Sequence, residues 1–180
     1  MNKLFDIKDY VVVITGGTGV LGRTIAKYLA KEGAKVIILG RKENVGAEIV
    51  ADITAEGGHC EFMKTDVMCQ QTVKQNCKDI LEKYGRIDTL LNAAGGNMAG
   101  AVIAPEGNFF DLEVEDFQKV LELNLTGTVI PTQVFRADGE AGKGLHHQLL
   151  VDGSLQTNHT RLRICSCKGG HQQLHRIHGN

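Results

Sequence analysis

The fold is decided by the stretch Val11-Val12-Val13-Ile14-Thr15-Gly16-Gly17-Thr18-Gly19-Val20-Leu21-Gly22, in which an apolar run leads into a glycine-rich turn. The β-branched residues of 10–14 are typical of a strand that is buried on both faces. Beyond the glycines, apolar residues recur at helical spacing as far as Gly33, which we expect to end a helix. A strand, a glycine turn and a helix in this order predict the first βα unit of a parallel sheet.

The same alternation continues along the chain. Further strands are expected at residues 35–39, 61–63 and 87–92, and further helices at 45–56, 73–84 and 117–135. Strands that alternate with helices of roughly 10–15 residues predict an α/β fold with a Rossmann-type, doubly wound parallel sheet. Right-handed crossovers then place the carboxyl ends of all the strands, and with them the ligand crevice, at one edge.

Composition limits the class of protein. The chain has 180 residues, 42% of them hydrophobic, and a formal net charge of −1, so it has material for one packed domain. This charge offers no electrostatic case for nucleic acid or a membrane surface, and no apolar run approaches the roughly 20 residues of a spanning helix. The charged start at residues 1–6 predicts no signal peptide, and five cysteines without framework spacing favour a reducing compartment. We expect a cytoplasmic protein.

The glycine turn is a candidate phosphate-binding site. Its glycines allow the backbone to approach a pyrophosphate closely, and the helix that follows offers free N–H groups and a partial positive charge. A tight connection without a ligand is the structural alternative. The residues predicted to bind the cofactor here are Thr15, Gly16, Gly17, Thr18, Gly19, Val20, Leu21 and Gly22.

Together with three later motifs, this turn resembles the short-chain dehydrogenase/reductase family over residues 7–135. Thr15, Gly16 and Gly22 match the glycine motif of that family, whereas Val20 occupies the position of its middle glycine. The later motifs are Asp66-Val67, Asn92-Ala93-Ala94-Gly95 and Leu123-Asn124-Leu125-Thr126-Gly127. In the second of these, Ala93 replaces an asparagine of the family pattern.

The resemblance implies roles for these residues. Asp66 and Val67 would contact the adenine, and the segment Asn92, Ala93, Ala94 and Gly95 would line the cofactor site. Asn124 would be catalytic, because it would hold a proton-relay water through its backbone. The parent enzyme would transfer hydride between a nicotinamide dinucleotide and a secondary alcohol or ketone.

Two further stretches, 94–97 and 104–112, look most like the branch that includes D-mannonate oxidoreductase (fructuronate reductase). This likeness implies a small-molecule substrate of the sugar-acid class, such as mannonate or fructuronate. It also implies a parent enzyme that assembles as a homo-oligomer.

The end of the second strand indicates the type of cofactor. An acidic residue there would bind the ribose 2′-hydroxyl and repel a 2′-phosphate. This chain instead has Gly40, Arg41 and Lys42, and a guanidinium can pair with a phosphate through two hydrogen bonds. NADP(H) is therefore favoured over NAD(H). The alternative is that Arg41 is a solvated cation of the loop.

The catalytic residues of the family are missing. Its chemistry needs a serine, a tyrosine as acid/base, and a lysine four residues later that lowers the pKa of the tyrosine. None of Tyr10, Tyr28 and Tyr84 is followed by a lysine at the fourth position. Residues 1–135 are therefore interpreted as the nucleotide-binding half of an incomplete Rossmann domain, and the chain as written is expected to be inactive.

Residues 136–180, called the tail below, differ from the rest. They contain no aromatic residue but six of the seven histidines. A reading frame shifted by one base permits Ser-Ile-Ile-Asn in place of residues 145–148 and Tyr-Ala-Ala-Ala-Lys in place of 164–168. The shifted tyrosine lies thirteen positions after a permitted serine, which is the family spacing. We interpret the tail as out of frame after a frameshift near Phe135, and expect it to be disordered or poorly packed.

A different interpretation takes the tail at face value. Metal-type side chains occur there at Cys165, Cys167, His171, His175 and His178. On this hypothesis the chain is a non-catalytic NADP-binding protein with a zinc-binding tail. Because the spacing fits no common structural zinc pattern, we expect no metal site.

Overall fold

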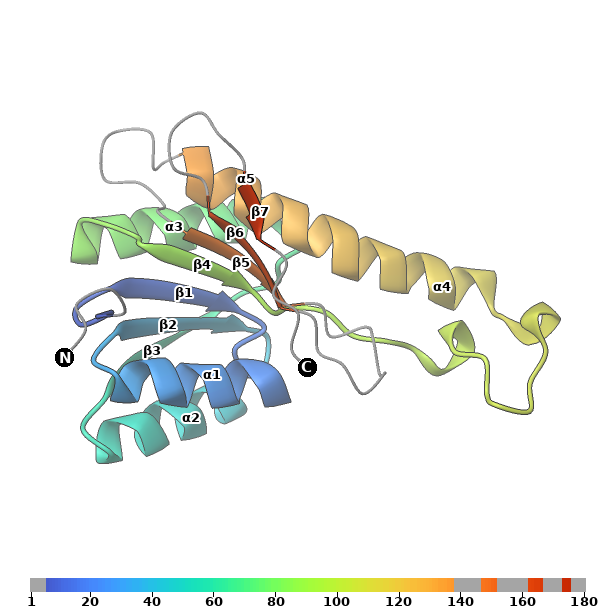
Figure 1. Ribbon diagram of the computed structural model, residues 1–180, viewed down its shortest axis with the longest axis horizontal. Coiled ribbons are helices and arrows are strands. Elements are labelled where there is room, and N and C mark those ends of the chain that lie inside the picture. Colours follow the sequence, from blue (N-terminus) through green and yellow to red (C-terminus); the bar gives the residue numbers. More distant parts are fainter. Residues whose placement is uncertain (1–5, 138–146, 152–161, 167–172, 176–180) are drawn as a thin grey trace.

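The computed structural model describes residues 6–137 and three further strands at 147–151, 162–166 and 173–175. In this part of the chain a single sheet of seven strands has the order β3-β2-β1-β4-β5-β6-β7, as Figure 1 shows. The strands β1 to β5 pair in parallel, and β6 and β7 pair antiparallel. The first four strands with their helices confirm the predicted Rossmann-type fold.

The elements follow the predicted alternation. The strands are β1 (Val11–Thr15), β2 (Lys35–Gly40), β3 (His59–Lys64), β4 (Thr89–Asn92), β5 (His147–Val151), β6 (Leu162–Ser166) and β7 (Gln173–His175). The helices are α1 (Val20–Lys31), α2 (Glu43–Ala55), α3 (Gln70–Tyr84), α4 (Val114–Leu121) and α5 (Gly127–Ala137), with short 3₁₀ turns at Ala99–Ala101 and Phe109–Asp111. The single helix expected at 117–135 is interrupted by a π-helical segment, Glu122–Thr126.

Alternation along the central strands builds a core on each face of the sheet. In β1, Val11 and Val13 belong to the cluster under α3 and α5, whereas Val12 and Ile14 belong to the cluster under α1 and α2. All four side chains are at most 3% exposed. Strands that are buried on both faces have continuous apolar sequences, and for this reason they could be predicted from the sequence.

Helix α1 lies close to the sheet because its inner face is made of small residues. Gly22, Ala26 and Ala30 recur every four residues and are buried. A side chain larger than alanine on this face would push the helix away from β1 and β2. The start of α1, and with it the glycine turn, is therefore held at a fixed place over the sheet edge.

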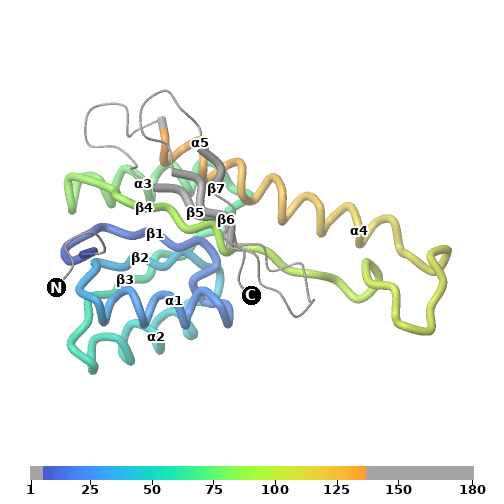
Figure 2. The backbone as a smooth tube through the Cα atoms, in the orientation of Figure 1, coloured from blue at the N-terminus to red at the C-terminus, as the bar shows by residue number. Residues whose placement is uncertain are grey.

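Helix α4 and the loop before it extend away from the sheet, as the tube in Figure 2 shows. Four apolar side chains along α4, the π-helical segment and α5 are exposed, and we call them the apolar stripe: Phe117, Leu121, Leu125 and Val129. A spacing of four residues drifts around an α-helix of 3.6 residues per turn. One wider π-turn opposes that drift.

No helix of the described residues is long and apolar enough to cross a membrane.

The tail contains regular structure that the sequence did not predict. It was expected to be disordered or poorly packed, yet β5 pairs with β4, β6 with β5, and β7 with β6. A ladder of backbone hydrogen bonds needs no particular side chains, so an open strand edge can pair with any extended segment. The prediction was a tail that is disordered or poorly packed against the open sheet edge, and it stays a prediction, since beyond Ala137 only these three strands of the tail are described.

A buried carboxylate ties β4 to the start of β1. Asp88 is 0% exposed, and its Oδ2 accepts a hydrogen bond of 2.8 Å from the amide of Val11. Its own amide donates back to the carbonyl of Val11 at 2.9 Å, and Arg86 forms an ion pair with Oδ1. The carboxylate thus fixes the register between the two central strands.

Asp88→Ala is expected to lower the free energy of unfolding by about 2–3 kcal/mol, because the Val11 amide loses a charged acceptor in a buried place. Urea denaturation of the 180-residue chain measures it. The matched control is Asp79→Ala, which removes an exposed carboxylate that accepts a hydrogen bond from Gln75 on α3. Equal losses for the two variants would show that Asp88 has no special structural role.

Candidate functional site

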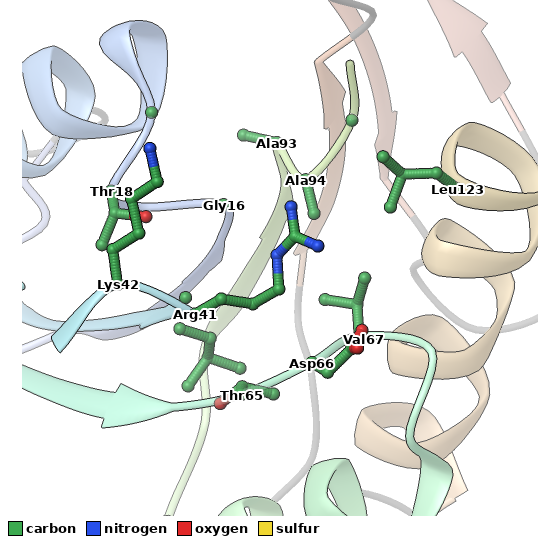
Figure 3. A pocket seen from close by; sticks show the side chains of 14 residues that line it. Gly16, Thr18, Arg41, Lys42, Thr65, Asp66, Val67, Ala93, Ala94 and Leu123 are labelled. Atoms are coloured by element: carbon green, nitrogen blue, oxygen red, sulfur yellow. The ribbon is translucent and has the colours of Figure 1, made fainter. Parts of the chain in front are cut away.

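A pocket of about 270 Å³ opens at the carboxyl ends of the strands, where the topology predicted it (Figure 3). Its volume is at the lower end of the range for ligand sites. It is lined by Gly16, Thr18, Gly19, Leu39, Gly40, Arg41, Lys42, Thr65, Asp66, Val67, Ala93, Ala94, Gly95 and Leu123. The walls therefore come from the segments that follow β1, β2, β3 and β4, together with one residue of the π-helical segment.

The glycine turn touches the backbone of β4 so closely that no side chain fits between them. Gly16 has φ +66°, and a Cβ there would lie 2.5 Å from the carbonyl oxygen of Ala93. A Cβ at Gly22 would lie 2.4 Å from the carbonyl oxygen of Gly16. In contrast, the side chain of Val20 is 86% exposed, so this position accepts a valine in place of the family's middle glycine.

The start of α1 adjoins the pocket, because its N-cap residue Gly19 lines the wall. No side chain caps its first turn, and that turn contains no acidic residue. The first amide groups of a helix have no partner within the helix, and they carry the positive end of its dipole. The turn and the helix start therefore form a cradle suited to a pyrophosphate.

The end of β2 supplies positive charge and no carboxylate. Gly40 is buried, whereas Arg41 and Lys42 are exposed and form no ion pair within residues 6–137. In Figure 3, Arg41 extends across the pocket in the direction of Ala94, and Lys42 runs beside Thr18. Among the described residues of the wall, the only acidic side chain is that of Asp66, whose Oδ1 accepts a hydrogen bond of 3.0 Å from the amide of Met68.

Beyond β4, the chain is held against the glycine turn by one hydroxyl group. Thr15 Oγ1 accepts hydrogen bonds of 3.2 Å from the amides of both Ala93 and Ala94. Asn92 is buried, and its Nδ2 donates to Thr132 at 3.2 Å, while its Oδ1 has no hydrogen-bond partner. The alanine at position 93 leaves this arrangement intact, because the interaction uses the backbone.

Asn124 connects the π-helical segment to the pocket wall. Its Oδ1 accepts from the amide of Gly96 at 3.0 Å, and its Nδ2 donates to the carbonyl of Gly96 at 2.9 Å. Its own carbonyl accepts from the hydroxyl of Thr128 at 2.9 Å. A π-turn in a helix often marks a functional site, and here it brings Leu123 to the pocket and Asn124 to the loop after β4.

Comparison with known proteins agrees with this geometry. The family model for short chain dehydrogenase matches residues 10–144. The chain belongs to the short-chain dehydrogenase family. It is 40% identical over 131 residues to uncharacterized oxidoreductase UxuB of Bacillus subtilis (strain 168), which covers 68% of this chain and 47% of that protein. It is 39% identical over 121 residues to the 3beta-hydroxysteroid dehydrogenase of Mediterraneibacter gnavus, covering 67% and 41%.

Among solved structures, the short-chain dehydrogenase fold is shared with a protein described as "putative D-mannonate oxidoreductase" from Haemophilus influenza, with bound NAD. The TM-score is 0.68 at 30% sequence identity, and the match covers 78% of this chain and 54% of that chain. The chain thus spans about half the length of the relatives it matches.

Most of the predicted cofactor residues of this short-chain dehydrogenase lie on the pocket wall. Those that do not line it are Thr15, Gly17, Val20, Leu21, Gly22 and Asn92, and the predicted catalytic residue Asn124 does not line it either. Three wall residues were not predicted, namely Leu39, Thr65 and Leu123. Leu39 and Thr65 could have been found from their places at the ends of strands, whereas Leu123 carries no signal in the sequence.

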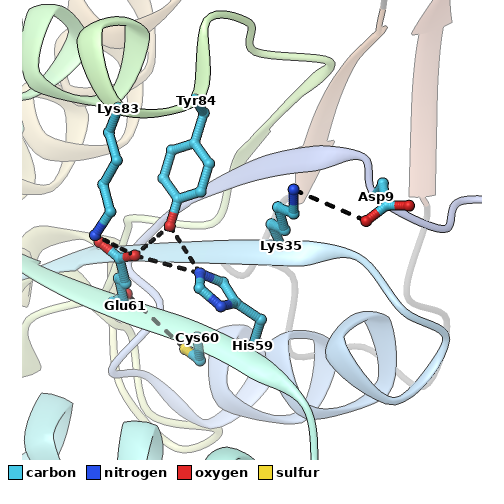
Figure 4. A network of polar contacts seen from close by, with 7 residues as sticks. All are labelled: Asp9, Lys35, His59, Cys60, Glu61, Lys83 and Tyr84. Atoms are coloured by element: carbon cyan, nitrogen blue, oxygen red, sulfur yellow. Dashed lines mark hydrogen bonds and ion pairs between the residues drawn. The ribbon is translucent and has the colours of Figure 1, made fainter.

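None of the three tyrosines, all within the described residues, lines the pocket. Tyr84 belongs to a polar network at the edge strand β3 (Figure 4), where it donates a hydrogen bond to Glu61 and contacts His59 Nε2 at 2.7 Å. Burial and the Glu61 carboxylate raise the pKa of Tyr84 above its usual value. This phenol is therefore unsuited to exchange a proton near neutral pH.

The zinc hypothesis concerns Cys165, Cys167, His171, His175 and His178, whose side chains lie outside the described part of the chain. In the part that is described, no group of three His, Cys, Asp or Glu residues is placed to hold a metal ion.

Gly22→Ala is expected to lower the free energy of unfolding by about 1–3 kcal/mol, because the added methyl group collides with backbone rather than with a movable side chain. Gly19→Ala is the matched control from the same turn, where a Cβ would lie 3.2 Å from the nearest atom. Chemical denaturation compares the two. If Gly19→Ala is the more harmful change, the turn does not pack as described.

Proposed function

We propose that this chain is the dinucleotide-binding half of a cytoplasmic short-chain oxidoreductase that prefers NADP(H) to NAD(H). The parent reaction is hydride transfer between the nicotinamide and a secondary alcohol or ketone, in a sugar acid such as mannonate or fructuronate. The 180-residue chain itself binds the cofactor but does not catalyse this reaction. Its tail, residues 136–180, is proposed to be out of frame.

The observation that carries the proposal is the make-up of the pocket wall. The free amides at the start of α1 suit the pyrophosphate, and Asp66 and Val67, which line the same pocket, are proposed to contact the adenine. Next to them, a buried glycine ends β2 and two unpaired cations follow it. A wall with two cations and no carboxylate at position 40 favours the extra phosphate of NADP(H).

The substrate class is supported by the relatives. The structure with bound NAD is described as a mannonate oxidoreductase, while one curated relative acts on a hydroxysteroid. The stretches at 94–97 and 104–112 favour the first class. Asn124 is proposed to hold a proton-relay water through its backbone, since it lies in the π-helical segment and its side chain is bonded to Gly96 in the loop after β4.

The proposal of inactivity has a structural basis. Proton transfer needs an acid/base side chain at the hydroxyl or carbonyl oxygen of the substrate, and no tyrosine of this chain lines the pocket. The first serine in the sequence is Ser154, so residues 6–137 contain none to polarise a carbonyl group.

For the cofactor, Arg41→Ala is expected to weaken NADPH binding by about tenfold, which corresponds to one charge-assisted contact. NADH binding should change little. Titration of the 180-residue chain with each reduced dinucleotide measures both constants, and Lys78→Ala on α3 serves as a control for the loss of a surface cation. If the chain binds NADH more tightly than NADPH, and Arg41→Ala leaves both affinities unchanged, the NADP(H) preference is refuted.

For activity, the purified chain should give no dehydrogenase turnover with fructuronate, mannonate or a 3-hydroxysteroid. A gene in which the frame is restored near codon 135 should regain turnover with a sugar acid. The oxidation or formation of the reduced nicotinamide is followed by absorbance. Turnover by the chain as written, or none by the restored protein with any of these substrates, would contradict the proposal.

For assembly, the parent enzyme is proposed to be a homo-oligomer in which the apolar stripe meets a second copy. The stripe is an exposed apolar surface, and a twofold contact would pair this same patch on the two copies. Leu121→Glu should convert the restored protein to a smaller species in size-exclusion chromatography with light scattering. Tyr28→Glu, at an exposed aromatic residue on α1, is the control. If the Leu121→Glu variant keeps the mass of the restored protein, the apolar stripe is not the contact between the copies.

A further inference from the structure

Helix α3 carries a polar side chain on the face that it buries against the sheet. The buried residues of this helix are Val73, Asn76, Cys77 and Ile80, and all of them except Asn76 belong to an apolar core cluster. Asn76 is only 7% exposed. Burial of a side-chain amide is unfavourable unless the amide is hydrogen-bonded, so the partner of Asn76 indicates what this residue does.

The partner is Thr65, the residue at which the chain leaves β3. Nδ2 of Asn76 donates to Thr65 Oγ1 at 2.6 Å, and the same hydroxyl group donates to the carbonyl of Met63 at 3.0 Å. The amide of Thr65 donates to the carbonyl of Gly40 at 2.8 Å. Because its one hydroxyl proton is already donated, Thr65 is suited to hold the chain in place rather than to donate to a ligand.

Thr65 is followed directly by the two residues that are proposed to contact the adenine. Figure 3 shows Thr65, Asp66 and Val67 in succession along the pocket wall. The turn beyond them is compact, because Asp66 accepts the amide of Met68 with its Oδ1 and the amide of Cys69 with its carbonyl, both at 3.0 Å. Helix α3 begins directly after Cys69. The hydrogen bond from α3 back to Thr65 therefore closes the whole connection between β3 and α3.

We infer that Asn76 is a positioning residue for the adenine end of the pocket, acting through Thr65 on the carboxylate of Asp66. Oδ2 of Asp66 accepts no hydrogen bond from residues 6–137, so it is available to the 6-amino group of an adenine. Such a bond weakens steeply with distance and angle, so a small displacement of Asp66 removes it. Asn76 does not line the pocket and can act only through the residues that it holds.

This inference rests on the proposed function, because it needs a dinucleotide in the pocket. The measurement that tests it is the preference of the 180-residue chain for adenine over hypoxanthine. NADPH and its deamino analogue differ only at the 6-position of the base, where hypoxanthine has a carbonyl oxygen in place of the amino group. The parent chain should bind NADPH about tenfold more tightly, as expected for one hydrogen bond to a carboxylate. Asp66→Ala should abolish the preference.

Asn76→Leu has nearly the same shape but removes the donor. It should reduce the preference for NADPH to less than about threefold, because NADPH loses affinity and the deamino analogue does not. Gln75→Leu is the matched control, since Gln75 is the exposed neighbour on α3 and donates only to Asp79. It should keep the preference of the parent chain. A merely structural role for Asn76 would weaken both nucleotides equally.

A second pair of variants changes the acceptor instead of the donor. Thr65→Val removes the hydroxyl group with little change of shape, and it should reduce the preference as Asn76→Leu does. Thr65→Ser keeps the hydroxyl group and should keep the preference. The double variant N76L/T65V should lose no more than Thr65→Val alone, because both changes remove the same hydrogen bond. The two variants of Thr65 provide the test even if Asn76→Leu does not fold.

The outcomes separate the two proposals. If the parent chain binds neither NADPH nor NADH, the proposed function fails and this inference fails with it. If the parent binds NADPH but Asn76→Leu keeps the preference for adenine, or weakens both nucleotides equally, the inference is overturned while the proposed function stands. Equal affinity of the parent for NADPH and its deamino analogue would overturn it too, since Asp66 would then not reach the adenine. A double variant that loses much more than Thr65→Val would show that Asn76 does not act through Thr65.

Discussion

The structure depends on the contact between the glycine turn and the backbone after β4. Gly16 approaches the carbonyl of Ala93 within a distance that excludes any Cβ, and Thr15 accepts the amides of Ala93 and Ala94. This contact joins the ends of the two central strands at one level. It therefore sets the floor of the pocket and the direction in which α1 presents its free amides.

Residues that directly follow or end a strand could be predicted from the sequence to line the pocket. Gly16, Gly40 and Asp66 each follow a recognisable strand, and parallel strands bring such positions to one edge whatever lies between them. Leu123 could not be found in this way. It reaches the pocket because a π-turn rotates it there, and its apolar pattern fits an uninterrupted helix equally well.

Strand pairing in the tail shows a second limit. Composition predicts whether a segment can bury enough apolar surface, but β5 joins the sheet through backbone groups that composition does not describe. In contrast, the buried strands β1 and β2 could be predicted from the sequence, because both of their faces need apolar side chains. A segment at an open edge is under no such constraint, so its sequence carries little information about its pairing.

The order of the chain separates binding from chemistry. Every group suited to hold the phosphates and the adenosine lies between residues 15 and 67, with the loop after β4 and the π-helical segment closing the other side. These groups are mostly backbone amides and short side chains fixed by the first four strands. Proton transfer, by contrast, requires an acid/base group next to the substrate oxygen, and the phenol of Tyr84 is instead held at the β3 edge by Glu61. Residues 6–137 therefore carry the pocket that is proposed to hold a nicotinamide dinucleotide, while no tyrosine among them lines it. Because the pocket wall is built from residues of the first four strands, the turns after them and the π-helical segment, its geometry does not depend on a tyrosine that would transfer a proton.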